Sequence, residues 1–293
     1  MQEQRIWLQQ GEQAGIQYRL LPPRQALRGL AGFHAGSQRG VSLDFSDYRE
    51  YHPGDDVRSL DWGVYARSDR LVVKLYHEEV SPHLDIILDA SQSMALTDAK
   101  SKALLGLGAL LSSAAAGSDC SWNAFSIKNR LAPLERGNEI PSLWGEVTFS
   151  TENNPAAHLQ SGNSFKRLGM RVLVSDLLWD AEPLSVLRRL SENASGVVVV
   201  QLLAQADSIP PQQGKYWLDD VETGESMEVF VDAAAQRRYR RSLELHTQLW
   251  VEACRQTGVM YCQLIAEEFL DGWVLDPLIR TGMLEYQKGN HSC

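Results

Sequence analysis

Cysteine is scarce in this chain, and none of the four cysteines stands at a spacing that holds a metal. Cys120, Cys254, Cys262 and Cys293 form no Cys-x-x-Cys pair and have no histidines at zinc-ligand intervals. This excludes the common structural zinc sites. We expect reduced and mostly buried thiols.

Long apolar runs are absent as well. The longest run, residues 103–117, is too short to cross a membrane and is broken by Ser112 and Ser113. The first residues, MQEQR, lack an apolar segment of signal-peptide length. We therefore expect a cytoplasmic protein with no membrane span.

Basic residues are in the minority. The chain has 28 Lys and Arg against 37 Asp and Glu, a formal net charge of -9. This charge opposes binding to nucleic acid unless a local basic patch overrides it. One such cluster, Arg237, Arg238, Arg240 and Arg241, begins a predicted helix; we interpret it as a solvated face, with docking of an acidic partner as the alternative.

Several enzyme motifs are also missing. There is no Gly-x-x-x-x-Gly-Lys-Ser/Thr loop for phosphate and no Gly-x-Ser-x-Gly turn for a nucleophilic serine. Gly106 and Gly108 lie inside a predicted helix and lack the third glycine of a dinucleotide fingerprint. These absences favour a binding protein over an enzyme.

What the sequence does contain, from residue 84 onward, is the alternation of a mostly parallel α/β sheet flanked by helices. Strands are predicted at 84–88, 122–127, 130–134, 171–174, 197–203 and 259–265, and an antiparallel pair at 215–219 and 227–231. Helices are predicted at 99–116, 155–168, 182–193 and 233–256.

Three segments are expected from the changes in pattern. Residues 1–80 carry short alternating pieces separated by Gly and Pro, which predict a β-rich N-terminal extension. Residues 81–267 form the α/β domain, with an antiparallel insertion near 215–231. Residues 268–293 form a C-terminal tail with a short helix near 278–286.

Oxygen-bearing side chains follow two of the predicted buried strands. Asp89, Ser91 and Ser93 come after one strand, and Asp176 comes after another. Parallel strands end at one edge of a sheet, where ligands of open α/β sheets bind, so we expect these residues to lie together. Two carboxylates and two hydroxyls, completed by water, suit Mg²⁺. The alternative is that Asp89 and the serines only cap the following helix.

A resemblance to known proteins extends this pattern. Residues 89–93, Asp-Ala-Ser-Gln-Ser, resemble the metal-ion-dependent adhesion site of von Willebrand factor A domains, and residues 174–177 resemble the strand that supplies its distal aspartate. The upstream signature resembles the domain-of-unknown-function 58 family, a von Willebrand factor A lineage often associated with MoxR-type ATPases. That signature comprises Gly40-Val41-Ser42-Leu43-Asp44-Phe45, Arg49-Glu50-Tyr51, Pro53-Gly54-Asp55-Asp56-Val57-Arg58, Leu60-Asp61-Trp62 and Ala66-Arg67.

The resemblance implies a Rossmann-like von Willebrand factor A domain with a metal ion, Mg²⁺ or else Mn²⁺ or Ca²⁺. Ser91 and Ser93 would bind the ion directly, with Asp89 and Asp176 assisting, often through water. A threonine from a middle loop completes the ring in the family. This chain lacks the usual Gly-Gly-Thr there, so Thr151 is the candidate and Asn153 its competitor.

The charged side chains of the upstream signature have two interpretations. Arginine and aspartate at this density on turns can form mutually orienting pairs that fix the extension, or they can form a recognition surface. The residues concerned are Asp44, Arg49, Asp55, Asp56, Arg58, Asp61 and Arg67.

The functional prediction is a non-enzymatic protein-interaction module. The resemblance implies a MoxR-type AAA+ ATPase and other von Willebrand factor A proteins as partners. Two alternatives stay open. One is a magnesium-dependent phosphohydrolase with Asp89 as nucleophile, although Ser91 stands where such enzymes need a second carboxylate. The other is a structural subunit whose metal site has decayed.

Overall fold

The computed structural model describes residues 2–21, 43–78, 82–150, 155–159, 165–219 and 226–287. The chain divides into two compact units, one made of residues 1–23 and 82–293 and the other of residues 24–81. The larger unit holds a six-stranded sheet, and the smaller one holds a two-stranded hairpin.

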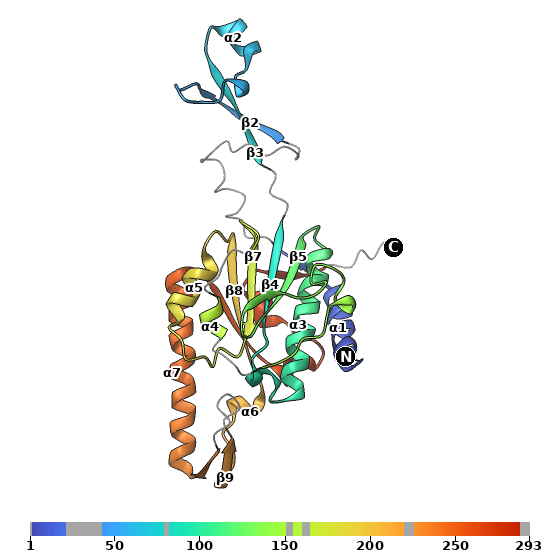
Figure 1. Cartoon of the computed structure of the whole chain (residues 1–293), viewed down its shortest axis with the longest axis vertical. Helices are drawn as coiled ribbons and strands as arrows, with labels where there is room; N and C mark the ends of the chain where they lie inside the picture. The colour runs from blue at the N-terminus through green and yellow to red at the C-terminus, as the bar shows by residue number, and fades with distance from the viewer. Residues whose placement is uncertain are drawn as a thin grey trace. The chain divides into compact units, whose positions relative to one another are not determined.

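The six-stranded sheet forms the centre of the larger unit (Figure 1). Its strand order is β11-β8-β7-β4-β5-β6, and every strand except β6 runs parallel to its neighbours. The predicted mostly parallel α/β sheet is therefore confirmed. Its strands are β4 (His83–Asp89), β5 (Ser121–Ile127), β6 (Leu131–Pro133), β7 (Met170–Ser175), β8 (Gly196–Leu203) and β11 (Met260–Ile265).

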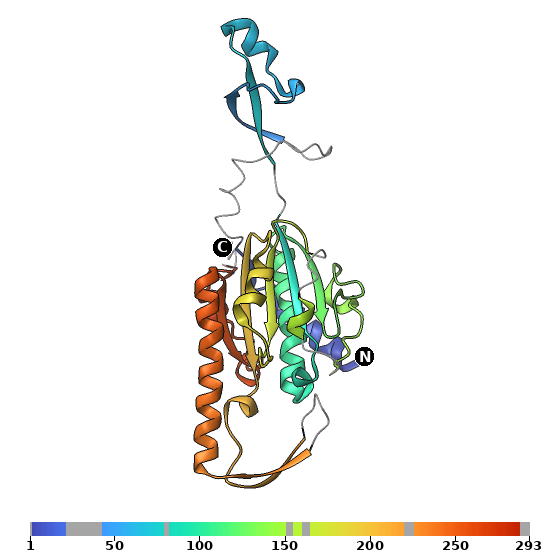
Figure 2. The ribbon, with the colours of Figure 1, turned by 60° about the vertical axis from the view of Figure 1, so that its left-hand side comes forward.

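The central strands are continuous apolar runs because both faces of the sheet are covered. Successive residues of a strand point to opposite faces. Accordingly, Ile86 and Leu88 of β4 join the core beneath α3 (Asp98–Ala116), whereas Ile87 joins the core beneath α5 (Pro183–Ser191) and α7 (Ala233–Thr257). Figures 1 and 2 show α3 and α7 on opposite sides of the sheet.

The N-terminal segment differs from the sequence prediction. Residues 2–15 form a helix, α1 (Gln2–Gly15), which packs against α3, and β1 (Tyr18–Leu20) pairs with β12 (Leu284–Tyr286). These residues therefore belong to the larger unit and not to a β-rich extension. The helical pattern is easily missed, because α1 buries only Leu8 and small residues on a polar sequence.

Glycine explains how closely α1 and α3 approach each other. A side chain at Gly11 of α1 would collide with the backbone of Gly106 in α3, and one at Gly106 would collide with the ring of Trp273. Gly106 therefore serves helix packing, which agrees with the rejection of a dinucleotide fingerprint at this position.

The C-terminal residues are not a peripheral tail. Helix α8 (Ala266–Leu270), helix α9 (Asp276–Arg280) and β12 bring a set of buried side chains into the core. The helix expected near 278–286 is instead α9 followed by a strand, and Gly282 lies between them with a φ of 76°. The buried residues are Phe269, Leu275, Leu278, Met283 and Leu284.

The other predicted elements differ mainly in length. The helix expected at 155–168 is helical only in α4 (Pro155–His158); residues 165–168 are not helical, and 160–164 lie outside the described ranges. The antiparallel insertion is confirmed as β9 (Gly214–Asp219) and β10 (Ser226–Val231). Short helical turns occur at η2 (Gln92–Ala95), η3 (Pro141–Leu143) and α6 (Gln205–Ser208). No helix of the described ranges combines the length and the apolar character that a membrane crossing requires.

The smaller unit pairs β2 (Leu43–Glu50) with β3 (Val72–Glu78) around η1 (Val57–Ser59) and α2 (Trp62–Ser68). Asp61 caps α2 by accepting hydrogen bonds from the Gly63 and Val64 amides, and Lys74 lies 3.3 Å from its carboxylate.

Part of the charged signature is therefore structural. Arg49 pairs with Asp55 at 2.8 Å, and Asp56 caps η1. The Arg67 guanidinium donates to the Gly63 carbonyl, and the side chain of Asp44 lies outside the described part.

Candidate functional site at the carboxyl edge of the sheet

Strands β4 and β7 lie side by side and deliver two aspartates to the same edge. Leu88 pairs with Val174 in the ladder, and the Ser175 hydroxyl donates to Asp89 Oδ2 at 2.6 Å. Asp89 and Asp176 are both fully buried. The sequence-predicted meeting of these two strand ends is thus present in the structure.

Asp89 is held by three donors. The Ser91 amide donates to Oδ1 at 2.9 Å, and the Ser175 hydroxyl and the Trp179 indole N–H, at 3.0 Å, donate to Oδ2. Burial raises the pKa of Asp89, and the nearby carboxylate of Asp176 raises it further. A positive charge placed beside Asp89 would favour its ionised form.

The two serines do not cap the following helix. Ser91 makes no side-chain capping bond at η2, and Thr97 caps α3 instead. The hydroxyl oxygens of Ser91 and Ser93 lie 3.0 Å from each other. Ser91 is buried and Ser93 is half-buried, so the pair opens toward solvent at Ser93.

Thr151 and Asn153 lie outside the described residues. The preceding residue, Ser150, is bridged to Ser91, and its amide donates to the Ala90 carbonyl at 3.1 Å. The backbone therefore brings the middle loop to the correct edge of the sheet, up to Ser150.

A buried lysine, which the sequence analysis missed, lies at the same edge. Lys100, in the first turn of α3, has a side chain with 0% exposure, and its Nζ lies 2.8 Å from Asp176 Oδ2 and 2.9 Å from Asp207 Oδ2. Burial lowers the pKa of Lys100, but the two carboxylates outweigh that effect and leave the pKa raised. Its position among Ala103, Leu104 and Leu107, the apolar face of α3, was the available signal.

Neighbouring elements fix Asp176 and Asp207 further. The Leu178 amide donates to Asp176 Oδ1 at 3.1 Å, and the Ala204 amide donates to Asp207 Oδ2 at 2.8 Å. Gln201 of β8 donates to the Asp176 carbonyl at 3.0 Å. At the carboxyl ends of the strands, hydrogen bonds and ion pairs thus form a connected network that joins β4, β7, β8, α3 and α6.

A divalent cation fits at the serine hydroxyls better than at Asp176. Adjacent ligands of an octahedral Mg²⁺ lie about 2.9 Å apart when each bond is 2.0–2.1 Å, which matches the 3.0 Å between Ser91 Oγ and Ser93 Oγ. Both oxygens of Asp176 already accept hydrogen bonds, one of them from an ammonium group. Within the described ranges no three His, Cys, Asp or Glu side chains are grouped to hold a metal, so a cation here depends on hydroxyls and water.

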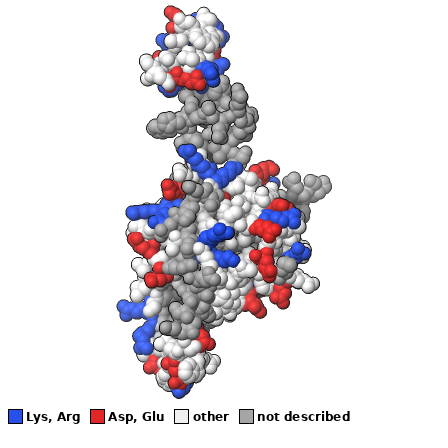
Figure 3. Space-filling view, in the orientation of Figure 1, with Lys and Arg blue, Asp and Glu red and all other residues white. Residues whose placement is uncertain are grey.

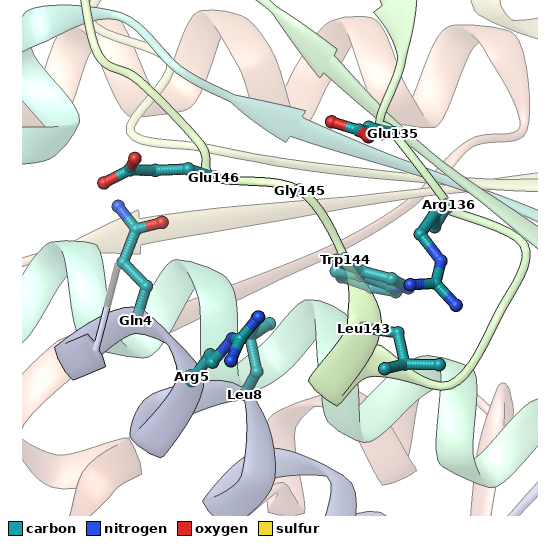
Figure 4. A pocket seen from close by; sticks show the side chains of 9 residues that line it. All are labelled: Gln4, Arg5, Leu8, Glu135, Arg136, Leu143, Trp144, Gly145 and Glu146. Carbon is teal, nitrogen blue, oxygen red and sulfur yellow. The ribbon is translucent and has the colours of Figure 1, made fainter.

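A separate cavity of about 400 Å³ lies between α1 and the loop that follows β6 (Figure 4). Arg5 and Leu8 of α1 face Leu143 and Trp144 across it. Its lining includes no residue of the strand edge, and its Arg136 is paired with Glu139 at 2.7 Å. The cavity therefore adds nothing to the proposed metal shell.

Comparison with known proteins assigns the family. The family model described as "Protein of unknown function DUF58" matches residues 47–248. This range contains the carboxyl ends of β4 and β7 and Lys100. The chain belongs to the DUF58 family. Uncharacterized proteins of Mycobacterium bovis and Mycobacterium tuberculosis are each 25% identical to this DUF58 chain over 251 residues, covering 77% of it and 76% of their own length.

Two solved structures show a distant likeness. They are the hypothetical protein BatB from Bacteroides thetaiotaomicron, with a TM-score of 0.37 and 10% identity over 68% of this chain and 98% of its own, and an aerotolerance-related membrane protein from Bacteroides fragilis. The second has a TM-score of 0.37 and 13% identity over 65% of this chain and 98% of its own. Neither likeness is close enough to carry an argument about this DUF58 chain.

Proposed function

We propose that this DUF58 chain is a non-enzymatic protein-interaction module that binds a divalent cation at Ser91 and Ser93. The observation that carries the proposal is the pair of serine hydroxyls at ligand spacing, backed by the buried carboxylate of Asp89. Bound there, Mg²⁺, Mn²⁺ or Ca²⁺ would offer a positive charge and a replaceable water to a partner's Asp or Glu.

The protein's own residues prepare this site. Ser175 and Trp179 hold the Asp89 carboxylate, and Asp89 in turn orients the backbone of Ser91. Lys100 neutralises Asp176, so the ion would not be surrounded by uncompensated carboxylates and would keep its attraction for a partner's carboxylate. Thr151, with Asn153 as its competitor, is the proposed further ligand.

The more specific parts of the proposal rest on the sequence signature alone. They are the von Willebrand factor A classification of the domain and the role as an adaptor or assembly partner of a MoxR-type AAA+ ATPase, together with other von Willebrand factor A proteins. A cytoplasmic location is part of the same proposal.

One observation favours a second candidate function, a structural subunit that works without a metal. The ammonium of Lys100 already supplies positive charge to this edge through Asp176 and Asp207. A phosphohydrolase is less well supported, because Asp89 is fully buried and both of its oxygens accept hydrogen bonds.

Binding of Mn²⁺, followed by electron paramagnetic resonance, separates the two main candidates. We expect one Mn²⁺ per chain at millimolar or lower concentration, and loss of this ion in the variant Ser91→Ala/Ser93→Ala. Ser113→Ala, in the last turns of α3, is the matched control and should bind as the wild type does. If the wild-type chain binds no Mn²⁺ at millimolar concentration, the structural-subunit function replaces the proposal.

Binding of the partner and phosphatase activity are measured in separate experiments. Binding of a purified MoxR-type ATPase should weaken when EDTA is added and when Ser91 and Ser93 are replaced. Phosphate release from p-nitrophenyl phosphate should stay at background. Phosphate release by the wild-type chain that disappears in the variant Asp89→Asn would instead establish that the chain is a phosphohydrolase.

A further inference from the structure

The larger unit carries an arm that projects beyond the edge at which the sheet strands end (Figures 1 and 2). We define the arm as the hairpin β9–β10 together with residues 233–249 of α7. Within its described residues the arm buries almost nothing: α7 has no buried residue before Trp250, over a length of about 25 Å at 1.5 Å per residue.

The hairpin exposes large apolar side chains. Trp217 and Phe230 are each 70% exposed, and the register places both on one face, because Trp217 pairs with Glu228 and Phe230 with Lys215. A two-stranded hairpin is marginal on its own in water. Its exposed aromatic face is therefore better explained by a binding partner than by the stability of the hairpin.

Helix α7 exposes a second set of side chains, made of cations and leucines. Arg238, Arg241, Leu245 and Leu249 follow one another at spacings of three and four residues, so they share one face of the helix. Leu245 is 51% exposed and Leu249 is 61% exposed. A different stripe faces the body, where Tyr239 donates to the Asp207 carbonyl at 2.6 Å.

The first turns of α7 contrast in charge with the rest of the chain. The arginine cluster, Arg237, Arg238, Arg240 and Arg241, is exposed in a chain with a formal net charge of -9. None of these arginines forms an ion pair with another described residue. They lie in the N-terminal half of α7, where the helix dipole gives a cation no support. In Figure 3, basic side chains project from the side on which Figure 1 draws α7.

We propose that the arm is a docking surface for an acidic protein segment that carries apolar side chains. The carboxylates of the segment would pair with the arginine cluster, and its apolar groups would cover Leu245, Leu249, Trp217 and Phe230. Pairing of two arms across the arginine cluster would set like charges against each other, which disfavours a second copy as the occupant. Leucines interleaved with the arginines, and the acidic chain around them, disfavour a phosphate backbone.

The arm adjoins the strand edge but does not depend on a cation there. Asp207, which pairs with Lys100, accepts a hydrogen bond from Tyr239 through its backbone carbonyl. Asp207 thus links the arm to the hydrogen-bond network at the carboxyl ends of the strands. Because the arm itself needs no metal, its binding can be measured in EDTA, where failure of the metal proposal has no effect.

Fluorescence anisotropy of two labelled 20-residue peptides tests the proposal on the full chain in EDTA. One peptide repeats Glu-Glu-Leu-Leu, and the other carries Lys in place of Glu. We expect saturable binding of the acidic peptide alone, at least tenfold weaker binding to Arg238→Glu/Arg241→Glu, and several-fold weaker binding to Trp217→Ser/Phe230→Ser. All four side chains are exposed, so the variants should keep the wild-type circular dichroism and unfolding midpoint.

The control variant is Arg188→Glu/Arg280→Glu, which changes the charge equally at exposed positions outside the arm. It should bind the acidic peptide within twofold of the wild type. Absence of saturable binding, or equal binding by the arm variants, overturns the proposal. If the chain binds single-stranded DNA or phosphatidylglycerol vesicles more tightly than the acidic peptide, the arm is a general anion-binding surface. If sedimentation shows a dimer that Phe230→Ser dissociates, the occupant of the arm is a second copy of the chain. Either result also overturns the proposal.

Discussion

Among single residues, Lys100 has the largest effect on the charge of the candidate site, because its buried ammonium group pairs with two carboxylates there. Asp89, Ser91, Ser93 and Asp176 could be predicted from the sequence because they come at or shortly after the ends of buried strands, and parallel strands end together. Lys100 and Asp207 could not, because the pairing of a helix residue with a residue 107 positions later depends on tertiary packing. A charged residue on the apolar face of α3 was the only local sign.

Replacing Lys100 by Met should destabilise the fold. It would leave Asp176 fully buried with no cationic partner, a change that typically costs about 3–5 kcal/mol. Urea unfolding of the larger unit, followed by circular dichroism, measures the change. Lys102→Met, at a half-buried position two residues away, is the control and should differ little from the wild type.

The double variant Lys100→Met/Asp176→Asn sharpens this prediction. Removal of the Asp176 carboxylate should recover part of the lost stability, because the carboxylate that then remains unpaired beside position 100 is that of Asp207, whose side chain is 15% exposed. A loss below about 1 kcal/mol in the single variant would mean that water reaches the pair and that Lys100 does not hold this edge together.

The buried cysteines allow a test of protonation. Burial raises the pKa of Cys120 to about 11 and the pKa values of Cys254 and Cys262 to about 12. At pH 8 these thiols are protonated in the folded chain, and the thiolate is the reactive form. In a Cys293→Ser background, iodoacetamide should therefore label the native protein far more slowly than the urea-unfolded protein, as mass spectrometry would show. Labelling of all three thiols at similar rates in both states would contradict the observed burial.

At the scale of elements, the sequence predicts best where burial is complete. Strands β4, β7 and β8 were found as apolar runs, and α3 was found as a helix at 99–116. Helix α1 was missed because its contact with α3 depends on glycine rather than on a visible apolar stripe. Strand β12 was missed for a related reason, because its partner β1 lies at the other end of the chain.

The packing of α1 on α3 predicts the effect of adding one methyl group. Gly11→Ala improves intrinsic helix propensity by about 1 kcal/mol, yet the new Cβ would collide with the backbone of Gly106. Overpacking of this kind costs about 1–3 kcal/mol, so we expect net destabilisation or displacement of α1. Gly117→Ala, where the nearest atom lies 3.6 Å from the new Cβ, should be close to neutral in the same thermal unfolding experiment. Stabilisation by Gly11→Ala would show that the two helices are farther apart.

At the scale of the whole molecule, the two chain ends complete the larger unit and the smaller unit is an insertion in it. Strand β1 pairs with β12, and residues of both ends enter the core of α3, including Leu8, Leu20, Leu278 and Leu284. Sequence patterns could not reveal this, because they indicate local structure and not which distant segments pair. The boundary predicted between residues 80 and 81 agrees with the start of the larger unit's second segment at Pro82.

This organisation predicts that the smaller unit can be removed without unfolding the larger one. Replacing residues 24–81 by a flexible Gly/Ser linker of about 20 residues keeps both segments of the larger unit. We expect one cooperative urea transition with a midpoint close to that of the larger unit in the intact chain. Deleting residues 2–17 is the contrasting change: it removes α1 from α3 and exposes the apolar surface that Leu8 and Ala14 cover, so the midpoint should fall or the chain should aggregate. If the linker variant instead loses its cooperative transition while the α1 deletion keeps it, the N-terminal helix belongs with the smaller unit and the division between the units must be redrawn.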